Sequence, residues 1–241
     1  MKQILIACLM VIFVAAQLYI PHVSYAQSTP SSWAADEVMA AMDEQLVTES
    51  VSADFQANIT REQFCELVIL AYEKISGHTA ALGSVSFDDT ANTEVLKAAA
   101  LGIVNGYGNG IFAPHELITR EQMATMLVRM IDKAVPQANV TKYTTHFFAD
   151  IDLISDWALP SVNFVFDKGI MRGVDNNFIV PKANTTCEQA VLLLYRVAER
   201  YYDEDTSLDS IYELPLERIA MEIRPANPLE FYKTTRYGCR A

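Results

Sequence analysis

Two arginines occupy equivalent positions in a repeated motif. The tetrapeptide ITRE occurs at 59–62 and again at 118–121, where it places Arg61 and Arg120, and each copy is followed by Gln and an apolar run. A planar guanidinium can form two parallel hydrogen bonds with one carboxylate. The two arginines are therefore candidates for binding an acidic group.

A third copy of the motif, TTCE at 185–188, carries Cys187 where the others carry arginine. A thiol cannot hold a carboxylate in this way, so we expect the third position to be weak or silent. Loss of one redundant site is favoured over a reactive cysteine, although a helix N-terminus lowers the pKa of a thiol. Arg172, in the turn of the same copy, is a candidate to compensate for the missing charge.

The motif stands at the predicted start of a helix in all three copies. Thr60, Thr119 and Thr186 are each followed three residues later by Gln, which is the pattern of a capping box. Apolar residues then recur at positions four, seven, eight and eleven after the Thr, which is one face of an α-helix. These apolar residues are Phe64, Leu67, Val68, Ala71, Met123, Met126, Leu127, Met130, Ala190, Leu193, Leu194 and Val197.

An arginine in the first turn of a helix is unfavourable for stability, because the helix dipole is already positive there. The unpaired N–H groups of a helix N-terminus also attract anions. Both considerations favour a ligand-binding role for Arg61 and Arg120. The alternative is that each arginine pairs with a nearby acid, such as Asp88, Asp150 or the adjacent Glu.

A short helix is predicted before each turn segment. The matching segments WAADEV and WALPSV begin at Trp33 and Trp157, and the second copy has Thr90 in place of the Trp. Aromatic rings can stack on sugars, but at helical spacing the two tryptophans are at least as well explained by core packing.

Turn-forming residues follow the short helix in two copies, as IVNGYGNGIFAP at 103–114 and IMRGVDNNFIVP at 170–181. Gly and Asn favour turns, and Gly102 and Gly169 suit the left-handed residue that ends a helix. Tyr107 lies in an exposed part of this turn and is a candidate for ligand contact. The first copy has lost the turn.

Each copy therefore reads as a short helix, a Gly-rich loop and a capped longer helix. One such unit is too small to bury an apolar helix face well. We therefore predict a mainly α-helical, pseudo-threefold domain around a central three-helix bundle. The predicted segments are a signal peptide at 1–26, a degenerate repeat at 27–80, repeats at 84–138 and 145–201, and a C-terminal tail at 202–241.

The N-terminal segment predicts export. Lys2 precedes an apolar run that ends at a small-residue cleavage site, so we expect cleavage after Ala26, with an uncleaved membrane anchor as the alternative. The remaining 17 Lys plus Arg face 30 Asp plus Glu, which argues against a nucleic-acid partner. Three separated cysteines, Cys65, Cys187 and Cys239, do not form a disulfide framework.

No metal site or cofactor is predicted. The segment DIDLISD at 150–156 lacks the central Gly and distal Glu of a calcium loop, so we interpret it as a solvated acidic connector. The chain also lacks the motifs of a serine hydrolase, a zinc protease or a phosphate-binding loop.

The repeated pattern resembles the S-layer homology (SLH) domain, which usually occurs in threes. The segment GIVNGYGNGIFAPHELITREQMATML at 102–127 carries nearly the whole pattern; the third copy matches it fairly well and the first copy least. The resemblance covers about 31–200. It implies a non-catalytic, extracytoplasmic module that anchors a protein to the cell surface by binding an acidic secondary wall polysaccharide, such as one bearing pyruvate ketals.

In this family the Arg of the motif is a principal ligand contact, and the role carries over only to Arg61 and Arg120. With the turn residues and neighbouring groups, the predicted ligand-binding residues are Arg61, Arg120, Glu62, Glu121, Tyr107, Gly106, Asn109, Trp157 and Arg172. Two alternatives remain: a degenerate scaffold that binds other surface proteins, with the tail at 202–241 as the contact, and a cell-wall hydrolase.

Overall fold

The computed structural model describes residues 28–174 and 177–202, and within them the chain is helical with no extended strand. This confirms the predicted all-α class. The predicted signal peptide at 1–26, Cys239 and all of the tail but Tyr202 lie outside the described residues. The elements are α2 (Ala35–Asp43), α3 (Glu49–Ser52), α4 (Arg61–Ser76), α5 (Thr93–Ala100), α6 (Arg120–Ala134), η1 (Pro136–Ala138), η2 (Ile151–Leu153), α7 (Leu159–Asp167) and α8 (Cys187–Tyr201).

The three long helices, α4, α6 and α8, begin with the same cap. The hydroxyls of Thr60, Thr119 and Thr186 each accept the N–H of the Gln three residues on, and that Gln side chain accepts the N–H of the Thr. These are the capping boxes that the sequence predicts. All twelve apolar residues predicted for the inner helix faces are buried, and they form the middle of the core.

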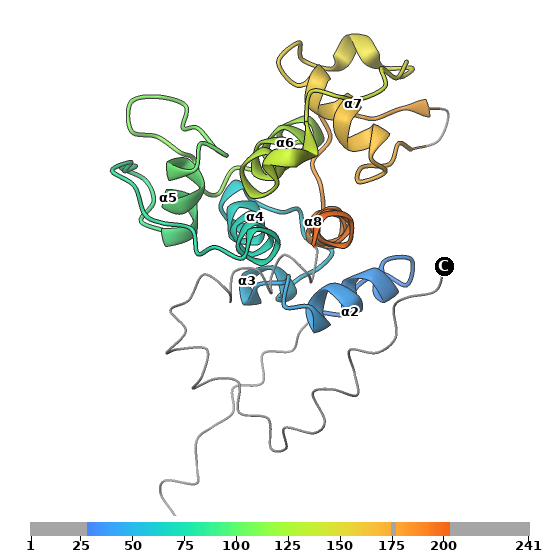
Figure 1. Cartoon of the computed structure of the whole chain (residues 1–241). Coiled ribbons are helices and arrows are strands. Elements are labelled where there is room, and N and C mark those ends of the chain that lie inside the picture. The colour runs from blue at the N-terminus through green and yellow to red at the C-terminus, as the bar shows by residue number, and fades with distance from the viewer. Residues whose placement is uncertain (1–27, 175–176, 203–241) are drawn as a thin grey trace, which may run out of the picture.

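The long helices lie together at the centre of the molecule and the shorter helices lie around them (Figure 1). Helix α4 packs against both α6 and α8. Each short helix packs against the long helix of the preceding copy: α5 on α4, and α7 on α6. Helix α2 packs on α8, which closes the ring between the first copy and the third.

The first N–H groups of each long helix donate to carbonyls of another copy. Arg61 N–H donates to Glu116 O at 2.9 Å and Glu62 N–H to Pro114 O at 3.0 Å. The equivalent bonds join α6 to Ala183 and Pro181, and α8 to Ala57 and Phe55. The expectation that these N–H groups attract an anion is therefore wrong, because neighbouring carbonyls already use them.

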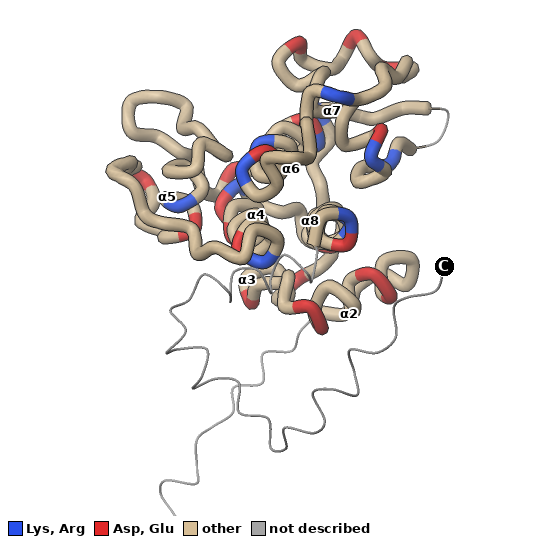
Figure 2. Tube along the Cα trace, in the orientation of Figure 1, with Lys and Arg blue, Asp and Glu red and all other residues tan. Residues whose placement is uncertain are grey.

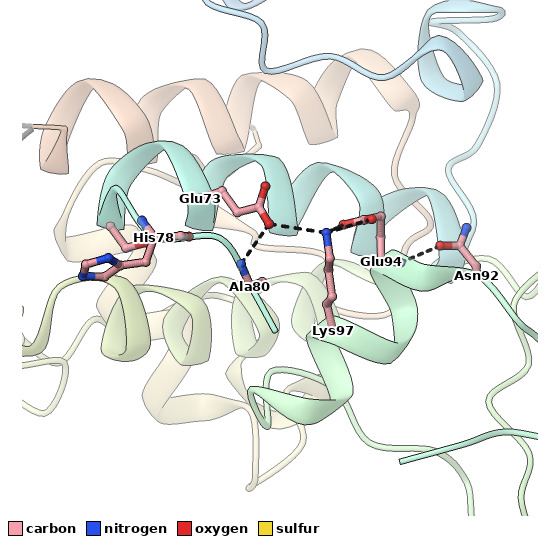
Figure 3. Close-up of polar contacts among 7 residues, drawn as sticks. Glu73, His78, Ala80, Asn92, Glu94 and Lys97 are labelled. Atoms are coloured by element: carbon pink, nitrogen blue, oxygen red, sulfur yellow. Dashed lines mark hydrogen bonds and ion pairs between the residues drawn. The ribbon is translucent and has the colours of Figure 1, made fainter. Parts of the chain in front are cut away.

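Side chains also fix the connection between α4 and α5 (Figure 3). Glu73 Oε1 accepts a hydrogen bond from Ala80 N–H at 2.9 Å and lies 3.4 Å from Lys97 Nζ. Asn92 caps α5 by accepting the N–H of Glu94 at 2.9 Å. These contacts hold the short helix of the second copy against the long helix of the first.

The turn segments are held by an aspartate of the same copy. Asp150 accepts the N–H groups of Ile179 at 3.0 Å and Val180 at 2.7 Å, and Asp89 makes the equivalent pair of bonds in the second copy. Asp150 is 6% exposed, so the prediction of a solvated connector at 150–156 is wrong for this residue. Its carboxylate positions the backbone that receives an arginine of the preceding copy.

The described helices give no candidate for a membrane span, since none combines the required length and apolarity. Within residues 28–174 and 177–202 no group of three His, Cys, Asp or Glu side chains is arranged to hold a metal ion.

Candidate functional site

Arg120 lies at the start of α6 and reaches into the turn of the third copy. Its Nε donates to Ile179 O at 2.8 Å and its Nη2 to Arg172 O at 2.8 Å. In the described part of the chain no carboxylate forms an ion pair with it, so the predicted alternative of pairing with a nearby acid is wrong. Burial lowers the pKa of Arg120, and the nearby Asp150 opposes that shift.

A groove of about 310 Å³ opens beside Arg120. Because of the ring arrangement, α2, the start of α6, the turn after α7 and α8 all contribute to it, and these elements come from all three copies. We call it the Arg120 groove. It is lined by Trp33, Glu37, Arg120, Arg172, Gly173, Val174, Gln189, Leu192, Leu193 and Arg196.

The groove combines an aromatic surface with positive charge. Trp33 is 60% exposed, so its ring is available to a ligand. This exposure rules out core packing for Trp33. The Arg172 side chain is exposed and lines the same groove as Arg120. The suggestion that Arg172 compensates at the Cys187 position is therefore not supported, because it belongs to a different groove.

Arg196 is a groove residue that the sequence interpretation missed. Its Nε and Nη2 pair with the two oxygens of Glu37 at 2.8 and 3.1 Å, and its Nη1 donates to Ile170 O at 3.3 Å. Arg129 makes the same bond to Ile103 O at 3.3 Å. Both arginines stand ten residues after the capping Thr of their helix, so the repeat spacing contained the signal.

Arg61 lies at the equivalent position between the first and second copies. Its Nε donates to Phe112 O at 3.2 Å and its Nη2 to Asn105 O at 3.3 Å. The guanidinium carbon is 4.7 Å from the ring centroids of both Tyr107 and Phe112. Arg61 is 7% exposed, and no carboxylate of the described residues pairs with it. We call Arg61, Asn105, Gly106, Tyr107 and Arg129 the Arg61 site.

The turn of the second copy supports this site. Tyr107 is 57% exposed beside the Arg61 guanidinium. A Cβ on Gly106 would lie 2.6 Å from Ile111 O, so only glycine fits there. Asn109 is exposed at the tip of the turn with φ 50°, a left-handed conformation that asparagine tolerates. These contacts give Gly106 and Asn109 a role in shaping the turn.

The structure places Glu62 and Glu121 between copies. Glu121 is 3% exposed and accepts the N–H and hydroxyl of Ser155, each at 3.0 Å, and it also pairs with Lys182. Glu62 accepts the hydroxyl of Thr90 at 2.8 Å. Both carboxylates contact the segment that leads into a neighbouring short helix.

Trp157, in the turn just before α7, is 56% exposed, so it too does not pack in the core. It does not line the Arg120 groove. Its place in the repeat is that of Trp33, and α7 packs on α6 as α2 packs on α8. The repeat therefore associates Trp157 with Arg129 and the Arg61 site.

The Cys187 position lacks these features. Cys187 is 2% exposed, and burial raises the pKa of its thiol to about 11, with Asp54 adding to the shift. A reactive cysteine is therefore the wrong interpretation. Thr90 replaces the tryptophan here, and Leu70 replaces the arginine found at 129 and 196.

Comparison with known proteins identifies the class. The family model of the S-layer homology domain matches residues 86–124 and 147–191, which are the two copies that carry the Gly-rich turn. These two segments of the chain are SLH domains. Domains of this family are cell-wall anchoring modules of S-layer and other surface proteins. This places the protein outside the cytoplasm, associated with the wall or cell surface.

Three relatives illustrate where such modules occur. The chain is 29% identical over 181 residues to an endoglucanase of Bacillus sp. strain KSM-635, and 26% identical over 174 residues to an amylopullulanase of Thermoanaerobacterium thermosulfurigenes. These matches cover 71% and 70% of this chain but 19% and 9% of the relatives. A surface layer protein of Brevibacillus choshinensis is 31% identical over 110 residues, which cover 45% of this chain and 10% of that protein.

Proposed function

We propose that this chain is a non-catalytic module that binds an acidic secondary wall polysaccharide and thereby holds its protein at the cell surface. The observation that carries the proposal is a pair of arginines without carboxylate partners among the described residues, one of them beside an open groove. Burying a cation that makes no direct ion pair is costly, and Asp150 acts on Arg120 only from beyond ion-pair distance. An acidic ligand would supply that counter-charge.

The groove chemistry favours a sugar that carries a carboxylate. Backbone carbonyls hold Arg120 by Nε and one Nη2 hydrogen, which fixes the plane of the guanidinium and leaves its other N–H groups for a ligand. Arg172 adds a second positive charge, and the exposed face of Trp33 offers a stacking surface. A pyruvate ketal on a sugar ring would present its carboxylate and an apolar ring face together.

We assign the ligand contacts to Arg120, Arg172 and Trp33 in one groove, and to Arg61, Tyr107 and Trp157 at the equivalent site. Glu62 and Glu121 are removed from the proposed contacts, because their carboxylates already bind neighbouring copies. Two weak sites on one polymer chain give an avidity greater than either site alone.

The test is binding of purified acidic wall polysaccharide to the mature protein, measured by isothermal titration calorimetry. We expect Arg120→Ala to weaken binding roughly tenfold or more, since a hydrogen bond to a charged group contributes about 1.5–3 kcal/mol. The matched control is Cys187→Ala, the same position of the third copy, which should bind as the parent does. Circular dichroism checks that each variant is folded.

Carboxyl reduction of the polysaccharide should abolish binding to the parent protein. Equal binding of Arg120→Ala and parent, with both folded, would refute the groove assignment. If neither the parent nor any variant binds the wall fraction, the alternative of a scaffold for other surface proteins is favoured. Turbidity of a wall suspension that stays constant with pure protein supports a non-catalytic module, whereas clearing would indicate a hydrolase.

A further inference from the structure

A second hollow adjoins the Arg120 groove on the third copy. It has a volume of about 390 Å³ and lies between the end of α7 and the last turns of α8. Arg172 and Arg196 line both the groove and this hollow, so the two cavities share a wall. We call it the basic hollow. It is lined by Lys168, Gly169, Arg172, Arg196, Glu199 and Arg200.

The first copy provides an internal comparison, because it has a hollow at the equivalent place. That hollow is lined by Asp43, Glu44, Gln45, Leu70, Glu73, Lys74 and Tyr202. Glu44 and Lys168 are both the residue after their short helix, and Gln45 and Gly169 both follow with a left-handed φ, of 59° and 69°. The lining is acidic in the first copy and basic in the third.

The fold does not require this positive charge. In the second copy the equivalent positions of Lys168 and Arg172 are Leu101 and Asn105, and the same backbone forms there. Figure 2 shows acidic residues along α2, whereas α8 and the end of α7 carry basic residues together with acidic ones. The chain as a whole has a net charge of −12, so a cluster of four cations in one hollow goes against its composition.

Two of these cations have acidic partners and two do not. Lys168 pairs with Asp167 at 2.9 Å and Arg196 pairs with Glu37. Arg172 and Arg200 are exposed and form no ion pair with any carboxylate in residues 28–174 and 177–202. Arg172 stands between the groove and the hollow, so an anionic chain that leaves the groove meets Arg200 and Lys168 next.

We propose that the basic hollow is a second anion-binding subsite, which holds a further acidic group of the same polysaccharide beyond the residue bound in the Arg120 groove. The inference rests on the proposed function. It specifies the ligand as a polyanion with acidic groups on neighbouring repeating units. Phosphate and carboxylate groups share the required chemistry. Copies of this chain joined through their acidic and basic hollows are the competing explanation.

The test compares Lys168→Gln/Arg200→Gln with Lys133→Gln/Lys142→Gln in the full mature chain. Both doubles remove two positive charges, and Lys133 is the equivalent of Arg200 in the second copy. With purified acidic wall polysaccharide at low salt, we expect roughly tenfold weaker binding for the first double and less than about twofold for the second. The difference should shrink as salt is raised, because the lost contacts are exposed charges.

The defined probes are wall polysaccharide with its carboxyl groups reduced and wall polysaccharide with its phosphodiesters cleaved by acid. Carboxyl reduction should already abolish binding through the Arg120 groove, so the phosphodiester-cleaved polysaccharide is the informative probe. If cleavage makes the two doubles equal while both still bind, the basic hollow holds a phosphate; if the difference between them persists, it holds a carboxylate. If the two doubles bind untreated polysaccharide equally while Arg120→Ala is weakened, the subsite is refuted and the proposed function stands. A concentration-dependent sedimentation coefficient that only the first double abolishes, without a change in polysaccharide binding, would refute it in favour of self-association.

Discussion

The Arg120 groove and the Cys187 position occupy equivalent places in the ring, yet they differ in every side chain suited to a ligand. The Arg120 groove has Arg120, Trp33 and Arg196 at three equivalent positions. The Cys187 position has Cys187, Thr90 and Leu70 there. The capping box and the buried helix face are the same at both. The comparison shows that the fold depends on the cap and the apolar face, and that the site residues can be lost without losing the helix.

The largest expected effect comes from removing both cationic positions. Arg61→Ala/Arg120→Ala should lose about 100-fold or more in affinity for acidic wall polysaccharide, because each charged contact contributes about 1.5–3 kcal/mol. Titration calorimetry measures it, with each single variant beside the double. A double variant no weaker than Arg120→Ala would mean that Arg61 takes no part.

The next largest effect tests whether an arginine alone restores a site. Cys187→Arg should not increase affinity for the polysaccharide, because Thr90 and Leu70 still lack the groove chemistry. It should also destabilise the fold by about 2 kcal/mol, since a larger side chain must enter a well-packed position. Urea unfolding measures the free energy and calorimetry the affinity. A gain in affinity would show that the residues around Cys187 can bind the polysaccharide once an arginine is present.

A smaller effect on affinity is expected from Glu37, whose carboxylate forms an ion pair with Arg196 inside the Arg120 groove. At the Arg61 site, Ser161 of the third copy stands at the place of Glu37, so Arg129 has no such partner among the described residues. Glu37→Gln should raise affinity through the Arg120 groove about fivefold, because the ligand no longer competes with an internal carboxylate. Asp36→Asn removes the same charge from an exposed neighbour and serves as the control. Unchanged or weaker binding by Glu37→Gln would indicate that Glu37 only clamps α2 to α8.

The smallest expected effect is the absence of a reaction. Burial raises the pKa of Cys187 to about 11 and also raises that of Cys65, so both thiols should stay protonated at pH 8. Iodoacetamide should therefore modify neither in the folded protein, as shown by peptide mapping, whereas both should react in urea. Modification of native Cys187 at neutral pH would contradict its buried position.

Local features of this fold were predictable from sequence. The three capping boxes and the twelve buried positions follow from residue types at fixed spacing, because both depend on one helix and its immediate start. The left-handed Gly102 and Gly169 follow for the same reason. The exposure of Trp33 and Trp157 was not predictable, since helical spacing alone does not tell which face meets a neighbour.

Long-range pairing accounts for the rest. Sequence could not show that the N–H groups of Arg61 and Arg120 bind carbonyls of the next copy, or that Asp150 is buried, because residues far apart in the chain supply the partners. Arg196 could have been predicted as a site residue, since Arg129 stands at the same spacing after the capping Thr of its own helix. The basic hollow could not have been predicted, because it lies between the end of α7 and the last turns of α8.

The packing of α2 on α8 has a consequence for biogenesis. An exported polypeptide emerges with its N-terminal end first, so α2 reaches the outside before the helix that covers its apolar side exists there. The ring can close only when α8 has also crossed the membrane. Until then the leading helix needs a chaperone or the growing chain itself for protection, and any product truncated before α8 would present an open seam to extracellular proteases.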